Sequence, residues 1–213
     1  MLNPHVIAFI GTVGAGKSTH MKLLAAALRS KGLKVKTTQL KVGNLWAHPL
    51  YRAALMGWPI FKNKYLFKLW IILDTLAISF KFLISIWLPL KAGYIILIEE
   101  YFPAVIADYL HIARINGHPP KDGIAIITYF YNKLATLVPF TSIFLDANDT
   151  ELKKRWKLRG TPSEKPEYLL MQRKLLLPLT KLLSRHTIYI DTTDSTIKDI
   201  NRRLEYLIRC AQP

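Results

Sequence analysis

Gly11-Thr-Val-Gly-Ala-Gly-Lys-Ser18 is the most informative segment of this sequence. It fits the pattern G-x-x-x-x-G-K-S of a P-loop, a glycine-rich turn whose backbone N–H groups cradle phosphates. An apolar run, residues 5–10, precedes the segment, and an amphipathic run, residues 19–29, follows it. This order predicts a buried strand that leads through the loop into a helix, whose positive N-terminal end attracts phosphate.

Each part of the loop has an expected task in binding ATP and Mg²⁺. Lys17 is expected to reach the β- and γ-phosphates, and the hydroxyl of Ser18 to bind magnesium. The glycines allow the backbone to turn back on itself without a Cβ penalty. The residues expected to surround the donor phosphates are Val13, Gly14, Ala15, Gly16, Lys17, Ser18 and Thr19.

Length and composition predict one α/β domain, residues 1–213. A hydrophobic content of 51% excludes a disordered chain. The single cysteine, Cys210, excludes a disulfide framework and a four-cysteine zinc site, so a reducing compartment, the cytoplasm, is expected. No signal peptide is expected, because the first strand begins within the first few residues.

The chain is strongly basic, with 30 Lys and Arg against 14 Asp and Glu and a net charge of +16. Such a charge attracts polyanions, which include nucleotides, nucleic acids and anionic membrane surfaces. The basic residues are spread along the chain and do not form one arm or stripe, which argues against nucleic acid. Positive charge that serves ATP and the solvated faces is the simpler interpretation.

Residues 61–88 form the most apolar segment. Lys68, Asp74 and Lys81 interrupt it about every seven residues, whereas a membrane-spanning helix needs about 20 apolar positions in a row. The pattern therefore favours a long core helix, which Pro89 is expected to end. A helix at a membrane surface or at a homodimer interface remains an alternative, because the segment is rich in aromatic side chains: Trp70, Phe80, Phe82 and Trp87.

A fully apolar run, residues 94–98, ends in Glu99 and Glu100. A carboxylate directly after a central strand is typical of a Walker-B site, where it lies beside the P-loop and reaches the metal. We therefore expect Glu99 to organise magnesium together with Ser18. Glu99 or Glu100 is also expected to orient or deprotonate the acceptor.

A basic segment near residue 155 predicts a lid, residues 155–167, over the donor phosphates. Arg155 and Arg159 are four residues apart and share a helix face, so both are expected to neutralise charge in the transition state. A solvated basic helix is the alternative. Five predicted strands, residues 5–10, 33–38, 94–98, 141–145 and 187–191, alternate with helices. They predict a P-loop NTPase fold, a parallel sheet with helices on both faces.

This layout resembles the thymidylate kinase family of P-loop nucleoside and nucleotide kinases over nearly the whole chain. The resemblance rests on Phe9-Ile-Gly-Thr-Val-Gly-Ala-Gly-Lys-Ser-Thr19, on Leu90-Lys-Ala-Gly-Tyr-Ile-Ile-Leu-Ile-Glu-Glu-Tyr101, on the pair Arg155 and Arg159, and on Ile188-Tyr-Ile-Asp-Thr-Thr193. It implies an ATP-dependent phosphoryl transfer with magnesium to a nucleotide or nucleoside, of which dTMP is the usual acceptor in the family.

The acceptor side departs from the family pattern. Glu100 replaces the arginine of the family's Asp-Arg-Tyr motif, which here ends in Tyr101. Asp74 is followed by a threonine, where the family has an aspartate-arginine pair. In the P-loop, Val13 replaces an aspartate. Glu99 matches the Glu-Arg-Ser motif of related deoxynucleoside kinases. A glutamate here repels a monophosphate but accepts a proton from a hydroxyl. The residues expected to contact the acceptor are Asp74, Tyr101 and Arg52, and Arg52, Lys41 or Arg114 could replace the lost phosphate clamp.

Three hypotheses follow from the sequence. The first is an ATP-dependent kinase of a nucleotide or nucleoside. The second is an ATP-binding switch, membrane-associated or oligomeric, that phosphorylates no small molecule. The third is a kinase for a non-nucleotide alcohol, such as a lipid that lies against Trp70 and Phe80.

Overall fold

The computed structural model describes residues 6–43, 45–119, 124–160, 162–164 and 166–209. Its centre is a parallel five-stranded sheet with the strand order β2-β3-β1-β4-β5. The strands are β1 (Val6–Gly11), β2 (Val35–Gln39), β3 (Ile95–Glu99), β4 (Thr141–Asp146) and β5 (His186–Asp191). The predicted α/β class, with five parallel strands, is therefore confirmed.

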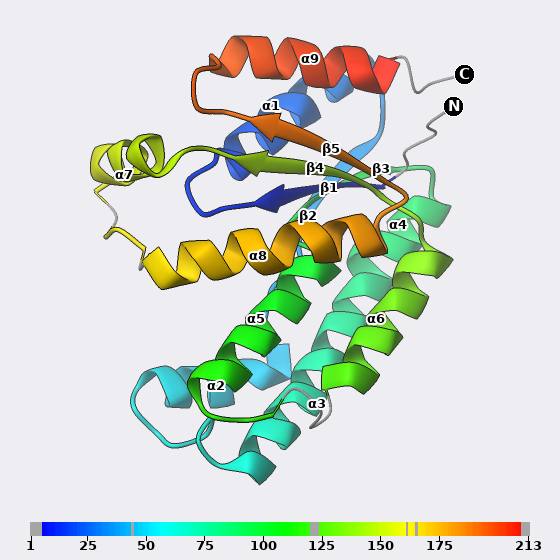
Figure 1. The fold of residues 1–213 in the computed structure, drawn as a ribbon. Helices are drawn as coiled ribbons and strands as arrows, with labels where there is room; N and C mark the ends of the chain where they lie inside the picture. Colours follow the sequence, from blue (N-terminus) through cyan, green and yellow to red (C-terminus); the bar gives the residue numbers. More distant parts are fainter. Residues whose placement is uncertain (1–5, 44, 120–123, 161, 165, 210–213) are drawn as a thin grey trace.

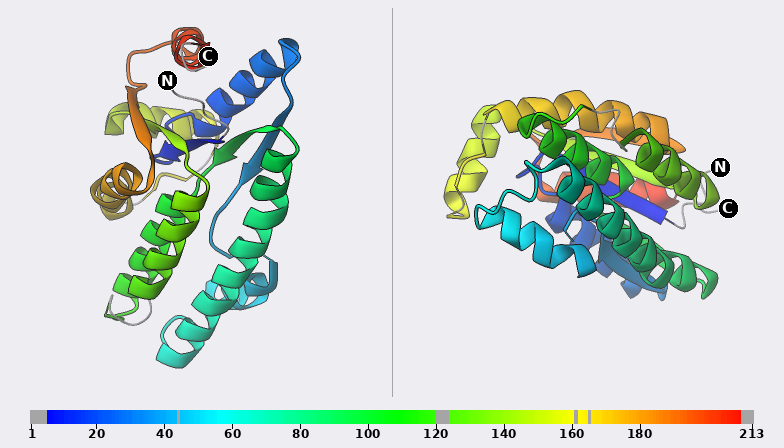
Figure 2. Two further views of the ribbon diagram at one scale, coloured as in Figure 1. Left: turned by 90° about the vertical axis from the view of Figure 1, so that its right-hand side faces the viewer. Right: turned by 90° about the horizontal axis from the view of Figure 1, so that it is seen from below.

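Helices cover both faces of the sheet, as Figure 1 shows. On one face lie α1 (Lys17–Ser30) and α9 (Ile197–Arg209), with α7 (Asp149–Leu158) near the strand ends. The other face carries α3 (Lys64–Phe82), α5 (Phe102–Ile115), α6 (Ile124–Leu137) and α8 (Pro166–Leu183). A short helix, α2 (His48–Leu55), follows a 3-10 turn, η1 (Leu45–Ala47), and lies beside the first turns of α3 in both views (Figures 1 and 2).

The alternation of β1 explains the two hydrophobic cores. Val6, Ala8 and Ile10 point into the core shared with α3, α5 and α6. Ile7 and Phe9 point into the core shared with α1, α7 and α9. Successive side chains of a strand leave opposite faces of the sheet, and β1 is almost fully buried on both. An uninterrupted apolar run is therefore what this central strand requires.

The strand order places the P-loop at the centre of the sheet. β1 lies between β3 and β4, with Phe9 opposite Glu99 and Gly11 opposite Leu145. Parallel strands present their carboxyl ends at one edge, and ligands bind where the strand order reverses. A Cβ on Gly11 would lie 1.8 Å from the carbonyl oxygen of Leu145, and the φ of +137° is also a glycine conformation. β4 therefore requires glycine at the first position of the loop.

The apolar segment forms one long helix that continues past Pro89, so the prediction that this proline ends the helix is wrong. Asn63 begins it, because its side chain accepts hydrogen bonds from the N–H groups of residues 65 and 66. A π-turn, η2 (Leu83–Trp87), follows α3, and α4 (Leu88–Lys91) completes it. A proline inside an α-helix lacks one N–H and clashes with the preceding turn. The wider π-turn loosens that turn, and the proline is accommodated.

Candidate nucleotide-binding site

The P-loop joins β1 to the N-terminus of α1. Gly16 is the N-cap of α1 with φ +92° and ψ 13°, a left-handed conformation. Gly14 has φ +91°, and a Cβ there would lie 2.7 Å from Nε1 of Trp156 on α7. Both glycines are thus needed, one for the turn into the helix and one for the close approach of α7. The loop and α7 form one packed unit around these two positions.

Lys17 lies curled over the loop that precedes it. Its Nζ donates hydrogen bonds to the carbonyl oxygens of Gly11 and Thr12, both at 3.0 Å, and the residue is 7% exposed. Burial lowers the pKa of the ammonium group, and the nearby carboxylates of Glu100 and Glu99 oppose that shift. The two loop carbonyls hold the cation at the centre of the site, at the end of the loop where phosphates bind.

The hydroxyl of Ser18 donates a hydrogen bond to Oε1 of Glu99 at the end of β3. The sequence placed these residues together as a magnesium site, and the structure brings them into direct contact. Hydroxyl and carboxylate oxygens are the donor types that Mg²⁺ takes from P-loop proteins. Among the described residues, no group of three or more His, Cys, Asp or Glu side chains could hold a metal ion. An ion at this pair would take its other ligands from phosphate oxygens and water.

A cavity of about 200 Å³ lies between the P-loop and the end of β3. Its lining includes most of the predicted phosphate and metal residues: Val13, Gly14, Gly16, Lys17, Ser18, Glu99, Glu100 and Arg159. Glu100 stands at its rim with φ +56°, and its carboxylate accepts a hydrogen bond from Nε2 of Gln39 at 3.3 Å. A non-glycine residue with positive φ is strained, which marks the turn after β3 as locally constrained.

Two N–H groups of the loop are already engaged within the protein. The N–H of Val13 donates to Oε1 of Gln172 on α8 at 3.3 Å, and the N–H of Ala15 donates to the carbonyl oxygen of Thr12 at 3.3 Å. Val13 thus contacts α8 through its backbone. Thr19 lines a second, larger cavity on the other side of the loop.

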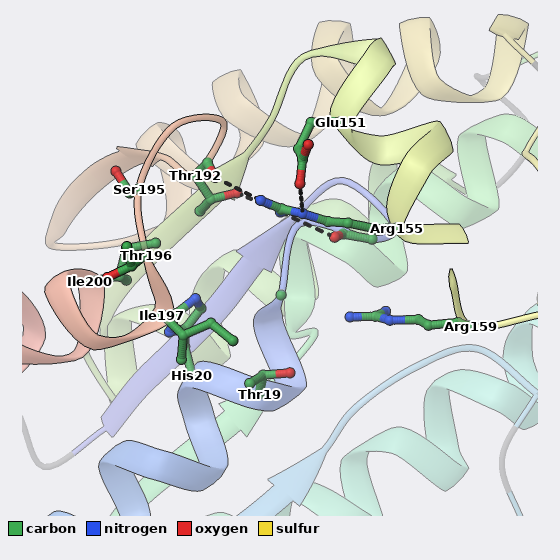
Figure 3. Close-up of a pocket in the computed structure, with 12 residues that line it drawn as sticks. Thr19, His20, Glu151, Arg155, Arg159, Thr192, Ser195, Thr196, Ile197 and Ile200 are labelled. Atoms are coloured by element: carbon green, nitrogen blue, oxygen red, sulfur yellow. Dashed lines mark hydrogen bonds and ion pairs between the residues drawn. The ribbon is translucent and has the colours of Figure 1, made fainter. Parts of the chain in front are cut away.

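That second cavity, of about 340 Å³, lies between the P-loop, α7 and the loop from β5 to α9 (Figure 3). His20 lies in its wall, and its Nδ1 is 3.1 Å from Oδ1 of Asn201 on α9. Burial lowers the pKa of His20, so the neutral ring is favoured at neutral pH. The cavity continues from the phosphate site, since Gly14, Gly16 and Arg159 line both. It has the size of a nucleotide-base pocket.

The two predicted lid arginines have different surroundings. Arg155 donates to the hydroxyl of Thr192 at 2.9 Å, to the carbonyl of the same residue at 2.7 Å, and to Glu151 at 3.0 Å. It therefore fixes the wall of the larger cavity. Arg159 lines both cavities, and in the larger one its side chain lies apart from the contacts of Arg155 with Thr192 and Glu151 (Figure 3). Of the two, Arg159 has the better position to contact a transferring phosphate.

The predicted lid segment, residues 155–167, spans the end of one helix and the start of the next. α7 ends at Leu158 with Arg159 as its C-cap, and α8 begins at Pro166. Thr161 and Lys165 lie outside the described residues. Of its basic residues, Arg155 and Lys157 lie in the last turn of α7, and Arg159 follows as the C-cap. The helix approaches the P-loop through Arg155 and Trp156.

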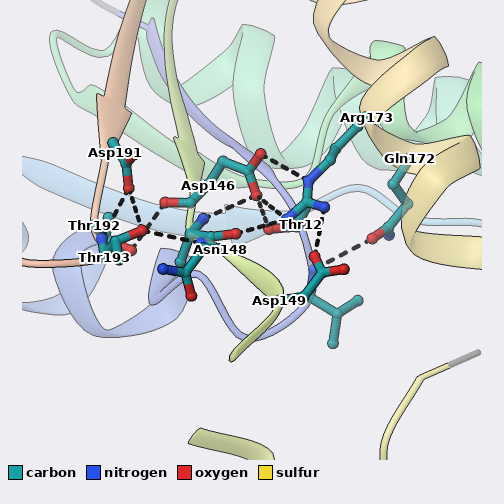
Figure 4. Close-up of polar contacts among 11 residues, drawn as sticks. Thr12, Asp146, Asn148, Asp149, Gln172, Arg173, Asp191, Thr192 and Thr193 are labelled. Carbon is teal, nitrogen blue, oxygen red and sulfur yellow. Dashed lines mark hydrogen bonds and ion pairs between the residues drawn. The ribbon is translucent and has the colours of Figure 1, made fainter. Parts of the chain in front are cut away.

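Asp146 at the end of β4 ties the loop to α8, and this role was missed from the sequence (Figure 4). Its carboxylate accepts hydrogen bonds from Oγ1 of Thr12 at 2.8 Å and from Nε of Arg173 at 3.0 Å. Arg173 also contacts Asp149 at 2.6 Å. Partial burial alone would lower the pKa of the guanidinium, but these two carboxylates raise it. In sequence, Asp146 looks only like the start of a helix cap.

A third, small cavity of about 20 Å³ lies beside Glu100, between α5 and α8. Asp108 of α5 and Tyr168 of α8 line it, and the tyrosine hydroxyl is 3.5 Å from Oδ1 of Asp108. Burial, with a smaller contribution from Glu100, raises the pKa of Asp108 to about 7. Asp108 was not identified from the sequence. It follows Glu100 by eight residues, and only the packing of α5 brings the two side chains to the same cavity.

The residues predicted to contact the acceptor line none of these three cavities. Asp74 is fully buried and accepts hydrogen bonds from the N–H of Gly43 at 3.0 Å and from the hydroxyl of Tyr109 at 2.8 Å. Tyr101 is also fully buried, and its ring stacks on Phe102 at 4.1 Å. Arg52 lies exposed on α2. The structure therefore does not bring these three side chains to the P-loop.

Comparison with known proteins shows the fold and leaves the substrate open. The sequence matches no model of a protein family and no curated protein. Among solved structures, the chain is similar to the thymidylate kinase from Ehrlichia chaffeensis. The two chains share one fold, a parallel five-stranded sheet with helices on both faces. The two structures agree with a TM-score of 0.59 at 18% identity, over 96% of this chain and 97% of the other. The expected resemblance is confirmed at the level of the fold.

Proposed function

We propose that the protein, as a single domain, transfers the γ-phosphoryl group of ATP to a hydroxyl group of a nucleoside or nucleotide. The observation that carries the proposal is the cavity in which Lys17, Ser18, Glu99 and Arg159 meet at the P-loop. The fold supports it, because a nucleotide kinase has the same architecture. Cytoplasmic location and magnesium dependence stay predictions.

The protein groups around this cavity would act by position and charge. Lys17 would leave the carbonyls of Gly11 and Thr12 and bind phosphate oxygens, and Arg159 would neutralise the charge that develops on the transferring group. Ser18 and Glu99 would hold Mg²⁺, which would supply positive charge to neutralise the donor phosphates. Arg155 would hold the wall of the larger cavity, where the base of ATP would lie.

The charge of the acceptor side favours a hydroxyl over a phosphate. Glu100 lies between the phosphate cavity and the smaller cavity, which Asp108 also lines. The carboxylate of Glu100, and that of Asp108 in its charged form, repel a phosphomonoester but can accept a hydrogen bond from a hydroxyl group. A nucleoside therefore fits this side better than dTMP, the acceptor that the resemblance implies.

The test is to mix the protein with ATP, Mg²⁺ and a panel of nucleosides and nucleoside monophosphates, and to measure ADP. We expect ADP that depends on at least one nucleoside. If no compound in the panel increases ADP formation, the proposal is contradicted.

A second candidate, an ATP-binding switch without an acceptor, is favoured by one observation. Trp70, Asp74 and Tyr109, all fully buried, fill the space between α3 and α5, where the resemblance placed the acceptor. This candidate would be supported if the protein binds ATP at equilibrium but forms no ADP with any nucleoside, monophosphate or simple alcohol. ADP that forms only with a non-nucleotide alcohol would support the third hypothesis from the sequence.

A further inference from the structure

The outer face of the long helix carries an exposed apolar stripe. The stripe is made of Tyr65, Leu69, Ile72, Leu76, Phe80, Leu83, Ile84 and Leu88, and we call it the α3 stripe. Their spacing of three and four residues places these side chains on one helix face. Tyr65 is 82% exposed and Ile72 is 56% exposed. At 1.5 Å per residue, the stripe is about 35 Å long.

The π-turn η2 keeps this stripe on one side of the helix. In an uninterrupted α-helix, Leu88 would rotate away from the line that ends at Leu83, because 3.6 residues make each turn. The π-turn Leu83–Trp87 takes up the extra rotation before α4 begins. The ammonium group of Lys36 on β2 donates to the carbonyl oxygen of Ile84 at 3.3 Å and holds the turn in place.

An aromatic side chain from a neighbouring segment extends the stripe. The ring of Trp46 lies 5.5 Å from that of Phe80, and Trp46 is itself 56% exposed. Tryptophan and tyrosine combine an apolar ring with a polar edge, which suits the boundary between lipid and water. α3 lies at the edge of the helical layer with α2 beside it (Figure 2).

The helix lies on the protein and does not leave it. Within the described residues, Lys64–Lys91 is long and apolar enough to cross a membrane by length and composition alone, with a mean hydropathy of 1.9. Its inner face, however, is part of the core: Trp70, Ala77 and Ile78 are fully buried there. The stripe could therefore lie along a membrane surface, but the helix could not cross the bilayer in this fold.

Charge decides between a membrane and a second copy of the chain. Residues 41–91 contain one acidic residue, the buried Asp74. They contain seven basic residues: Lys41, Arg52, Lys62, Lys64, Lys68, Lys81 and Lys91. A symmetric dimer through the stripe would bring two such cationic surfaces together, and like charges repel. An anionic bilayer offers the opposite charge together with an apolar layer.

We propose that the α3 stripe, with Trp46, is a docking surface for an anionic lipid membrane, on which α3 lies in the plane of the bilayer. The surface is distinct from the P-loop cavities, since none of its residues lines them. Docking therefore does not depend on nucleotide and stands apart from the proposed kinase activity.

The test is sedimentation of the full chain with vesicles of phosphatidylcholine, with or without 30% phosphatidylserine, in the absence of nucleotide. We expect at least tenfold more bound protein on the vesicles that contain phosphatidylserine, and a blue shift of the tryptophan fluorescence. Leu76→Glu is expected to reduce binding at least fivefold. Leu182→Glu, at an exposed leucine of α8 outside the stripe, is the matched control and should bind as the unchanged protein does.

Circular dichroism checks that both variants keep their helices. Failure of the unchanged protein to bind either vesicle would overturn the proposal, as would equal binding by the two variants. Light scattering tests the alternative, a dimer. If the unchanged protein is a dimer that binds no vesicles, and Leu76→Glu makes it a monomer, the stripe is an interface with a second copy of the chain.

Discussion

The proposed donor half and the proposed acceptor half of the site differ in charge and in packing. The donor half, formed by the P-loop, α7 and the loop after β5, has two open cavities with Lys17, Arg155 and Arg159 in or beside them. The acceptor half presents Glu100 and Asp108 at a space of about 20 Å³ between the end of β3, α5 and α8. A polyanion is therefore expected only in the donor half.

The difference follows from how each half is built. The donor half depends on backbone shape, which glycines and a helix N-terminus dictate, so a short motif is enough to specify it. The acceptor half depends on which side chains three separate helices bring together. Its substrate preference can change by single substitutions, such as glutamate at position 100, while the fold is kept.

The largest expected effect concerns the donor half. Lys17→Met removes the cation at the centre of the phosphate cavity and should lower acceptor-dependent ADP formation about 1000-fold. Lys22→Met, at an exposed position of the same helix, is the control and should leave the rate unchanged. Steady-state kinetics check this. Equal rates for the Lys17 variant and the unchanged protein would remove the P-loop from the reaction.

The two arginines of the donor half should separate in kinetics. Arg159→Ala should lower kcat about 100-fold with little change in the KM for ATP, because Arg159 lies over the phosphate cavity. Arg155→Ala should mainly raise the KM for ATP, because Arg155 holds Thr192 in the wall of the larger cavity. The same pattern for both variants would contradict this division of roles.

Asp108 should make the acceptor half sensitive to pH. Its pKa in the fold, about 7, lies above the ordinary value of 3.8, so folding disfavours the charged form. The contribution of this group to the free energy of unfolding therefore falls as the pH rises from about 4 to 7. Asp108→Asn should be more stable than the unchanged protein by about 4 kcal/mol at pH 8 and nearly equally stable at pH 4.

Urea unfolding at both pH values measures this difference. Glu167→Gln, at an exposed carboxylate of α8, is the control and should change stability equally at both pH values. A stability gain for Asp108→Asn that is the same at pH 4 and pH 8 would show that the carboxyl group is not buried as the structure has it.

The smallest expected effect concerns Asp74. Tyr109→Phe removes one of its hydrogen-bond donors and should lower the free energy of unfolding by about 1 kcal/mol with no change in the KM for the acceptor. Tyr129→Phe, at an exposed tyrosine of α6, should change neither. A several-fold change in the acceptor KM for Tyr109→Phe would instead return Asp74 to the acceptor site, as the sequence predicted.

The sequence predicted the parts that local patterns specify. The P-loop motif and the apolar strands gave the parallel sheet, and the pairing of Ser18 with Glu99 follows from the neighbouring strands β1 and β3. The helix through Pro89 could not be predicted, because a π-turn depends on contacts such as that between Lys36 and Ile84.

The missed site residues have no motif of their own. Asp146 contacts Arg173 across 27 positions of sequence, and Asp108 meets Tyr168 across 60. Only the packing of α5 and α8 against the sheet creates these contacts. The burial of Asp74 likewise depends on Tyr109, which lies 35 positions further along the chain.

We propose that the donor site at the P-loop faces an acceptor side that takes a hydroxyl and not a phosphate. The most direct measurement compares kcat/KM for thymidine with that for dTMP, each with ATP and Mg²⁺. We expect turnover of thymidine, or of another nucleoside in its place, to be at least tenfold more efficient than that of the matching monophosphate. Efficient turnover of dTMP, with none of any nucleoside, would contradict it.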